Sequence, residues 1–252
     1  MSTITAELSK TGQALGRETD VPQSCETCTA RPLSVCNVLS YPQLRRLADC
    51  GAVRAYAPRE DLVREGEPAD FAFNITEGMV MLFHRLPDNR RQVLGFLLKG
   101  DFLGLAAGAN YDLSVQALTP VKACRFPRQG LRRLLLKMPK LEEELLARAS
   151  DELVAARAHL SLLGRKTAIE RLSILLLDLA DRQARVEGSC SEIELPMTRI
   201  DIADHLGLTP ETVSRSLAVL RRLKAIQVTA GGAKLLKPDL LRSLAEAPEH
   251  HS

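Results

Sequence analysis

The longest regular pattern in the chain is an apolar stripe between residues 138 and 164, where leucine and alanine recur at three- and four-residue steps. Residues at this spacing share one face of an α-helix. A long helix with one narrow apolar face needs a surface to pack on, either its own domain or the same helix of a second copy across a two-fold axis. We favour the second and expect a homodimer whose interface contains Leu145, Ala149, Leu153, Ala156 and Leu160.

The pattern before this helix is different. Residues 53–126 form short apolar runs that are separated by glycine and turn residues. Several short strands at such spacing predict a small antiparallel barrel or roll. The glycines that divide the runs are Gly66, Gly78, Gly95, Gly100 and Gly104.

Near the C-terminus, the sequence carries signals for two short helices joined by a tight turn. Thr198 and Asp201 have the spacing of a capping box at the start of the first helix. Gly207 supplies the turn, Thr209 caps the second helix, and Pro210 suits its first position. This arrangement is the helix-turn-helix pattern of DNA-binding proteins.

The second of these helices has residue types that read DNA. Glutamate can accept from cytosine, arginine can bind guanine at two atoms, and serine can contact either kind of base edge. We therefore expect base readout by Glu211, Ser214 and Arg215. Residues 228–237, with two glycines at the tip, predict the hairpin wing of a winged helix. Contacts to the DNA backbone are expected from Arg199, Thr209, Thr212, Arg221 and Arg222.

Together these patterns predict an α+β protein: an N-terminal antiparallel β-roll, a long dimerisation helix and a C-terminal winged helix-turn-helix domain. The first 24 residues are polar and aperiodic, which is typical of a flexible tail. The expected divisions are a flexible tail at 1–24, a cysteine segment with the β-roll at 25–137, the dimerisation helix at 138–164, the DNA-binding domain at 165–245 and a second tail at 246–252.

Composition narrows the possible functions. The 252 residues, 45% of them hydrophobic, suffice for two domains with real cores. A net charge of +3 excludes a histone-like protein coated in basic residues and leaves room for a local basic patch. No apolar run approaches the roughly 18 residues that a membrane helix needs, and the N-terminus lacks the apolar stretch of a signal peptide. We therefore expect a cytoplasmic protein that does not enter a membrane.

Six cysteines in such a protein favour metal ligands or redox thiols over disulfides. Cys25 and Cys28 form a CxxC pair, and Cys36 follows within the same short segment. Cys124, in an expected strand, is the candidate for a fourth ligand. Four thiolates suit either an iron-sulfur cluster or a structural zinc ion, and a free thiol switch is a third reading. The spacing alone leaves these alternatives open.

The remaining candidates are weaker. Cys50 lies at an expected helix end and Cys190 in an expected loop, so we interpret both as bystanders. An enzyme built on a cupin-like barrel would need two or three converging histidines with a carboxylate. The expected barrel contains only His84, which argues against an enzyme.

The order of roll, long helix and winged helix resembles the CRP/FNR family of bacterial regulators, beyond residue 24. Glu211, Ser214 and Arg215 match the ExxSR recognition signature of its FNR-like branch. This signature is similar to that of proteins that read a TTGAT half-site within an inverted repeat, so the resemblance implies such a target here. The cysteine run resembles that of the branch's oxygen sensors, with Cys124 at the place of their fourth ligand.

This resemblance implies a [4Fe-4S] cluster held by Cys25, Cys28, Cys36 and Cys124. It implies a dimer that binds double-stranded DNA when oxygen is scarce and regulates transcription through RNA polymerase. Oxygen would then convert the cluster to a smaller form, and DNA binding would weaken.

Two departures from family patterns matter. Relatives that bind cyclic nucleotides hold the phosphate with an arginine, yet residues 101–116 here contain no arginine or lysine. Because a buried phosphate without a cation is poorly compensated, we expect no cyclic nucleotide. In the dimer helix, Leu153 and Ala156 offer little charge repulsion, so cluster loss is expected to weaken DNA binding without fully separating the subunits.

Overall fold

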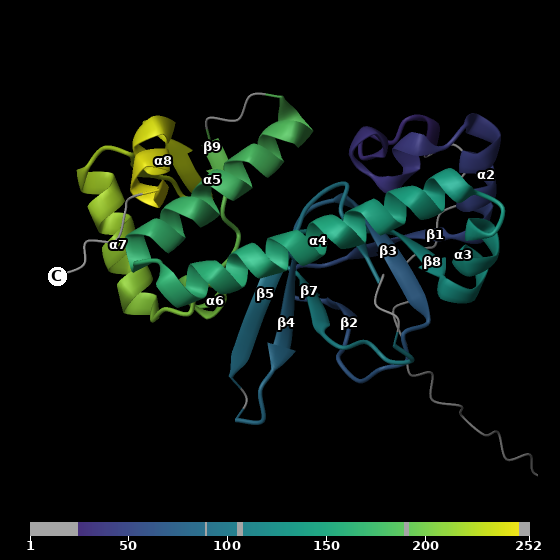
Figure 1. Cartoon of the computed structure of the whole chain (residues 1–252), viewed down its shortest axis with the longest axis horizontal. Helices are drawn as coiled ribbons and strands as arrows, with labels where there is room; N and C mark the ends of the chain where they lie inside the picture. The colour runs from purple at the N-terminus through teal and green to yellow at the C-terminus, as the bar shows by residue number, and fades with distance from the viewer. Residues whose placement is uncertain (1–24, 89, 105–107, 189–191, 247–252) are drawn as a thin grey trace, which may run out of the picture.

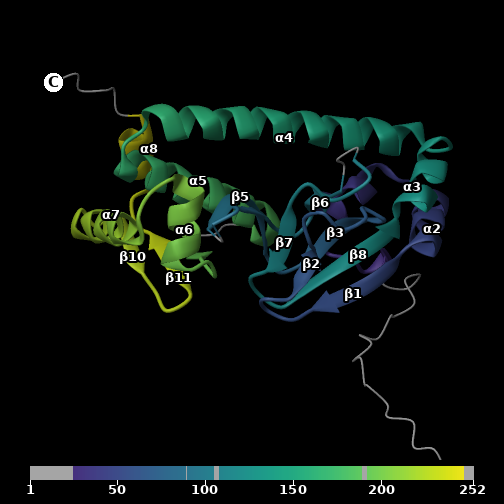
Figure 2. The same ribbon diagram turned by 90° about the horizontal axis from the view of Figure 1, so that it is seen from below.

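The computed structural model describes residues 25–88, 90–104, 108–188 and 192–246. Antiparallel sheets and helices make up these ranges, which confirms the α+β class. Helix α4 (Pro139–Arg165) crosses the molecule, from the β-roll and cysteine segment at one end to a helical C-terminal domain at the other (Figures 1 and 2). None of the helices in these ranges combines the length and the hydropathy that a bilayer-spanning segment requires.

Two four-stranded antiparallel sheets form the expected β-roll. One sheet has the order β1-β8-β3-β6, and the other has the order β2-β7-β4-β5. Side chains such as Phe73, Ile75 and Val115 are buried together in the core of the roll. The strands are β1 (Ala52–Tyr56), β2 (Asp61–Val63), β3 (Phe71–Glu77), β4 (Val80–Arg85), β5 (Arg91–Leu97), β6 (Phe102–Leu103), β7 (Ser114–Ala117) and β8 (Val121–Pro127).

Strand β4 begins with a continuous apolar run because both of its faces are covered. Val80 and Leu82 belong to the core of the roll. Met81 and Phe83 belong instead to the core that the roll shares with the C-terminal domain. Alternate residues of a strand face opposite sides, so this run marks a strand segment without a solvent face. The roll and the C-terminal domain are therefore joined by a buried apolar contact.

The cysteine segment packs on the outside of the roll. It consists of two short 3-10 helices, η1 (Arg31–Leu33) and η2 (Val35–Val38), followed by α2 (Tyr41–Cys50). Ser40 and Gln43 form the capping box that starts α2. After the last strand of the roll, α3 (Arg128–Leu135) packs beside α2 and leads into the long helix.

The long helix has one face in its own chain and another in solvent. Leu145, which we expected at the dimer interface, is instead buried against the cysteine segment of its own chain. The apolar residues left exposed include Leu146, Leu153 and Leu160, which repeat every seven residues. A seven-residue repeat is the spacing of a coiled-coil seam. The exposed stripe begins at Leu146, one residue after Leu145, where the expected interface began.

The C-terminal domain has the capped helices that the sequence predicts. Thr198 and Asp201 form the capping box of α6, and Gly207 ends that helix in the left-handed conformation. The Thr209 hydroxyl caps α7 by accepting from the Thr212 amide at 3.2 Å. The elements are α5 (Ala168–Glu187), β9 (Glu192–Glu194), α6 (Arg199–Leu206), α7 (Pro210–Arg222), β10 (Ile226–Val228), β11 (Gly232–Leu235) and α8 (Pro238–Glu246).

The wing is a three-stranded sheet, in which β11 pairs with β10 on one side and with β9 on the other. It therefore begins two residues earlier than the expected hairpin and gains a strand from before the helix-turn-helix. Gly232 makes this possible, because a Cβ at that position would lie 1.8 Å from the Ile193 carbonyl oxygen.

Candidate functional site

The four cysteines expected to bind a metal centre gather at one end of the β-roll. Cys25 and Cys28 precede η1, Cys36 lies in η2, and Cys124 lies in β8. Each of the other three thiols acts electrostatically on Cys124, which places all four in one neighbourhood. Residues from two distant parts of the sequence therefore share one site.

Local hydrogen bonds shape the loop between the second and third cysteines. The Arg31 amide donates to the Cys28 carbonyl oxygen at 3.2 Å. The Ser34 hydroxyl accepts from the Cys36 amide at 3.3 Å and donates to the Arg31 carbonyl oxygen at 3.2 Å. These bonds hold the loop as two tight turns between Cys28 and Cys36.

Burial controls the chemistry of these thiols. Burial is the main cause that raises the pKa of Cys36 to about 11. The Ser34 hydrogen bond opposes this shift, and the nearby Cys25 and Cys28 contribute to it. Burial also raises the pKa of Cys124 strongly, with smaller contributions from the three other thiols. Cys36 and Cys124 therefore stay protonated unless a positive centre compensates the charge of their thiolates.

This donor set fits a thiolate-bound metal centre, because metal ions or a cluster supply the missing positive charge. Cys25, Cys28, Cys36 and Cys124 would be the ligands. In the described ranges, no three His, Cys, Asp or Glu side chains already stand at the spacing of a single metal-ion site. The thiols are thus gathered, but they do not form a closed coordination sphere.

The cysteine site is continuous with the start of the long helix. Cys25, Cys36 and Cys124 pack against a buried cluster that includes Leu141 and Leu145 of α4. The cysteine segment therefore packs directly on the first turns of this helix.

The other two cysteines are separate from this group. Cys50 ends α2, and its sulfur lies beside Gly130 of α3, where a Cβ would come within 2.6 Å of it. Burial raises the pKa of Cys50, whereas Arg133 lowers it, and none of the four gathered thiols contributes. Cys190 lies outside the described residues.

The expected base-reading residues lie on the accessible side of α7. Glu211, Ser214 and Arg215 are exposed, whereas Val213 and Leu217 face the core. The Ser214 hydroxyl donates to the Pro210 carbonyl oxygen at 2.8 Å, so it must rotate to reach a base. The first turns of α7 thus present an acid, a hydroxyl and a cation on one open surface.

The expected phosphate contacts surround this surface. Arg221 and Arg222 are exposed in the last turn of α7, and Arg199 is half-buried at the start of α6. Thr209 and Thr212 use their hydroxyls for the cap of α7 and remain accessible, with 3.1 Å between the two hydroxyl oxygens.

Sequence reasoning missed the polar contacts that join the β-roll to α6. Arg91 of β5 lies 2.6 Å from the carboxylate of Asp201, the capping residue of α6. The Gln92 side chain donates to the Asp204 carbonyl oxygen at 3.0 Å. His205 lies against Phe96, with ring centroids 5.1 Å apart. No local sequence pattern predicts these contacts, since each joins residues that are more than a hundred positions apart.

Comparison with known proteins matches two parts of the chain. A model of the cyclic nucleotide-binding domain matches residues 53–138, and a model of the Crp-like helix-turn-helix domain matches residues 170–244. The first range covers the β-roll and α3, and the second covers most of the C-terminal domain.

Several curated proteins resemble nearly the whole chain. The transcriptional activatory protein AadR of Rhodopseudomonas palustris is 40% identical over 227 residues, which are 88% of this chain and 94% of that protein. The nitrogen fixation regulation protein FixK of Bradyrhizobium diazoefficiens is 37% identical, with 88% of this chain and 94% of that protein covered. Among solved structures, FixK2 from Bradyrhizobium japonicum has a TM-score of 0.72 at 32% identity, covering 79% of this chain and 99% of that chain.

Proposed function

Because the chain belongs to the CRP/FNR family of DNA-binding transcriptional regulators, and not to a family of enzymes, we propose that it is an oxygen-responsive member whose DNA binding depends on a [4Fe-4S] cluster. The observation that carries this proposal is the gathering of four cysteines beside the start of α4. Such a regulator acts in the cytoplasm, where it meets promoter DNA.

In this proposal Cys25, Cys28, Cys36 and Cys124 hold the cluster. Four thiolates are the usual ligands of a cubane, and a cluster of this kind near the protein surface is open to oxidation by oxygen. The chain itself supplies a buried set of thiols and a segment that packs on α4. Loss of the cluster would remove the positive charge that compensates the Cys36 and Cys124 thiolates, and it would free the segment to move away from the helix.

A thiolate set of this kind also suits zinc or a thiol redox switch. Either alternative keeps the DNA-binding fold and changes only the signal. Zinc gives colourless protein, whereas an iron-sulfur cluster absorbs visible light. The two are therefore separated by a metal assay and a spectrum.

The proposed DNA target is an inverted repeat of a TTGAT-like half-site, bound by a homodimer. In this complex Glu211, Ser214 and Arg215 of α7 would read base edges in the major groove, and Arg221 and Arg222 would contact phosphates. The dimer forms along the exposed seam of α4. Bound next to a promoter, it would regulate transcription through RNA polymerase.

We do not expect the β-roll to bind a cyclic nucleotide, although it matches the model of the cyclic nucleotide-binding domain. Residues 101–116 offer no basic side chain for the phosphate. Saturating cyclic AMP should therefore leave the affinity for DNA unchanged.

Matched cysteine variants test the assignment of ligands. Cys28→Ser should lose the iron of the anaerobically purified protein and its binding to the inverted repeat. Cys50→Ser removes a thiol that lies outside the group and should keep both. Equal iron in the two variants would show that the gathered cysteines do not hold the centre.

A further inference from the structure

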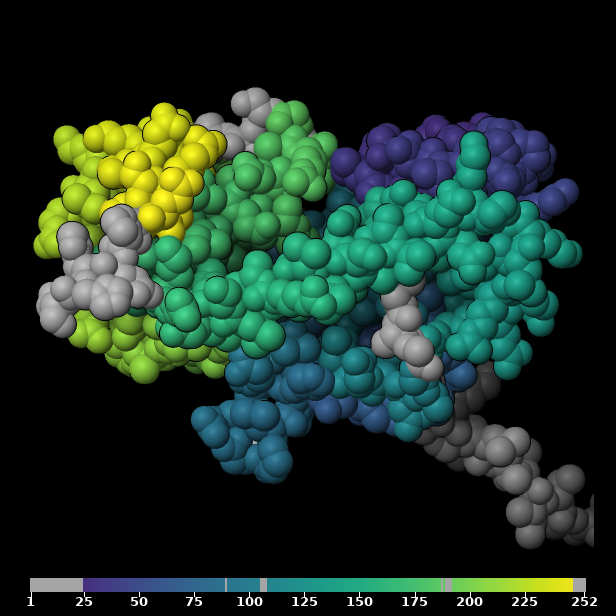
Figure 3. Space-filling model, viewed as in Figure 1, coloured from purple at the N-terminus to yellow at the C-terminus, as the bar shows by residue number. Residues whose placement is uncertain are grey.

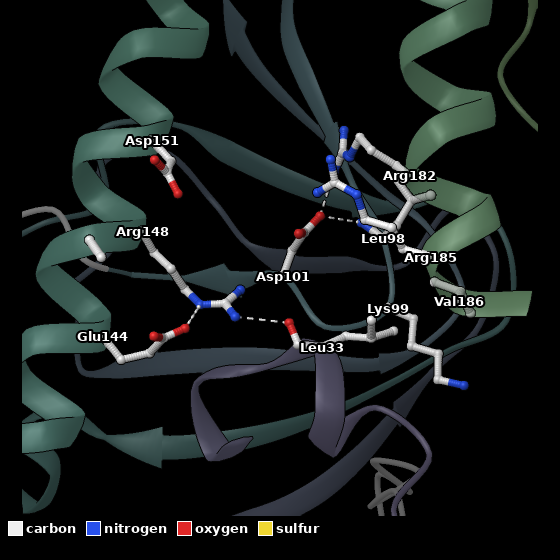
Figure 4. A pocket seen from close by; sticks show the side chains of 11 residues that line it. Leu33, Leu98, Lys99, Asp101, Glu144, Arg148, Asp151, Arg182, Arg185 and Val186 are labelled. Atoms are coloured by element: carbon white, nitrogen blue, oxygen red, sulfur yellow. Dashed lines mark hydrogen bonds and ion pairs between the residues drawn. The ribbon is translucent and has the colours of Figure 1, made fainter. Parts of the chain in front are cut away.

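One arginine of the long helix clamps the cysteine loop onto the β-roll. The Arg148 guanidinium donates to the Leu33 carbonyl oxygen at 2.9 Å and to the Gly100 carbonyl oxygen at 3.3 Å. Its Nε lies 2.9 Å from the Glu144 carboxylate, one turn earlier in α4. Because Leu33 lies between Cys28 and Cys36, this clamp holds the ligand loop itself (Figure 4).

The contact beneath the clamp is close enough to transmit a displacement. Gly100 has φ +97°, and a Cβ there would lie 2.6 Å from Cβ of Leu33. Leu33 therefore rests directly on the backbone of this glycine, and no other residue type fits without moving the loop. The cysteine loop and the turn that contains Gly100 are therefore in direct contact, and Arg148 holds both.

The next residue of this turn reaches the C-terminal domain. The Asp101 carboxylate accepts from the Leu98 amide at 2.7 Å and from the Arg182 guanidinium of α5 at 2.5 Å. The clamp and this ion pair lie on opposite sides of one hollow of about 270 Å³. The hollow lies where α4, α5 and the cysteine segment meet (Figures 3 and 4).

Helix α5 in turn carries the recognition helix. Leu172, Leu176 and Leu179 of α5 are buried in the same core as Leu217 and Leu220 of α7. Closely packed cores move as units, so a displacement of α5 carries α7 with it.

From this arrangement we propose an intrachain route from the cysteine site to the DNA-reading helix, additional to any effect on the dimer. It runs from the cysteine loop to Gly100 under the Arg148 clamp, then through the Asp101–Arg182 ion pair to α5 and α7. Arg148 and Arg182 are positioning residues, since neither is among the proposed cluster ligands or the proposed DNA contacts. This inference rests on the proposed function and assigns the coupling to named residues.

A double-mutant cycle on DNA affinity tests the route, because coupling between two sites is a difference of free energies. Cys28→Ser is measured in the native chain, in Arg182→Met and in Asp101→Asn, which breaks the same ion pair from the other side. All proteins are prepared anaerobically, and their metal content and thermal unfolding are recorded. We expect Cys28→Ser to weaken DNA binding about tenfold in the native chain. In the Arg182→Met and Asp101→Asn backgrounds it should weaken binding less than about threefold.

Arg185→Met is the matched control. Arg185 lines the same hollow on the same helix, but it makes no hydrogen bond or ion pair within the described residues. In this background the full loss caused by Cys28→Ser should remain.

The outcomes separate the two proposals. An equal loss in the native, Arg182→Met and Asp101→Asn chains would overturn the intrachain route and leave the cysteine-dependent regulator standing. No effect of Cys28→Ser on DNA binding in the native chain would overturn both. A loss that is suppressed in Arg185→Met as well would assign the effect to the charge of the hollow and overturn the role of the ion pair.

Discussion

The imidazole rings of His159 and His205 stack on one another, with centroids 4.3 Å apart and planes inclined by 16°. One ring belongs to α4 and the other to α6, so the stack joins the long helix to the helix-turn-helix. His205 is buried, and its Nδ1 lies 3.4 Å from the Val93 carbonyl oxygen of the β-roll. Three parts of the chain therefore meet at a single titratable group.

This burial makes stability depend on pH. Burial, with a smaller contribution from His159, lowers the pKa of His205 to about 4, and the bond to Val93 opposes this shift. Since the unfolded pKa is about 6.5, unfolded chains bind the proton first, and the stabilisation present above pH 6.5 is lost as the pH falls toward 4. The expected loss is up to about 3 kcal/mol.

The variant His205→Phe keeps an aromatic ring and removes the proton site. Urea unfolding of the native chain and of this variant at pH 7 and pH 5 measures the difference. The free energy of unfolding should fall less on acidification in the variant. An equal fall in both proteins would show that His205 does not titrate as its burial requires.

The ion pair between the roll and α6 should contribute to stability, because Asp201 is buried and Arg91 is only partly exposed. Arg91→Met leaves the carboxylate with its capping bonds but without its cation. We expect a loss of about 1–3 kcal/mol in the free energy of unfolding. Arg90→Met, which breaks an exposed pair with Asp88, is the control and should change little. A larger effect at Arg90 would contradict this assignment.

The two kinds of DNA contact should differ in their sequence dependence. Arg215→Ala should remove about 1–3 kcal/mol of discrimination at one guanine, measured with half-sites substituted base by base. Arg221→Ala should weaken binding to every site alike and flatten its dependence on salt. If Arg215→Ala stays fully selective, α7 does not read that base.

The seam of α4 should hold the dimer. Leu153→Glu places two carboxylates face to face across the two-fold axis, so sedimentation should shift toward single chains. Val154→Glu changes another exposed apolar residue, about 100° further round the helix. This control should remain dimeric. Dissociation of both variants, or of neither, would place the interface elsewhere.

Features set by neighbouring residues could be predicted from the sequence. The capping box of α6 and the cap of α7 each depend on residues three positions apart, and the structure has both. The end of α6 follows from Gly207, whose left-handed conformation few other residues adopt. The four-cysteine group came from resemblance as much as from spacing, because Cys124 reaches it only through the fold of the roll.

Features set by distant packing could not be predicted. The burial of Leu145 depends on where the cysteine segment lies, and the apolar period of a helix cannot tell one apolar neighbour from another. Arg91 and Arg182 look like ordinary surface cations in the sequence, yet both bind carboxylates of another domain. Such pairs are fixed by tertiary structure and leave no local signal.

Control of DNA binding by a cluster on the gathered cysteines can be measured in one experiment. Iron, sulfide and zinc content, a visible spectrum and affinity for the inverted repeat are recorded on anaerobic protein before and after exposure to air. We predict about four irons per chain, a visible absorbance that changes in air, and loss of DNA affinity with that change. Zinc without visible absorbance, or DNA binding that air leaves unchanged, would contradict it.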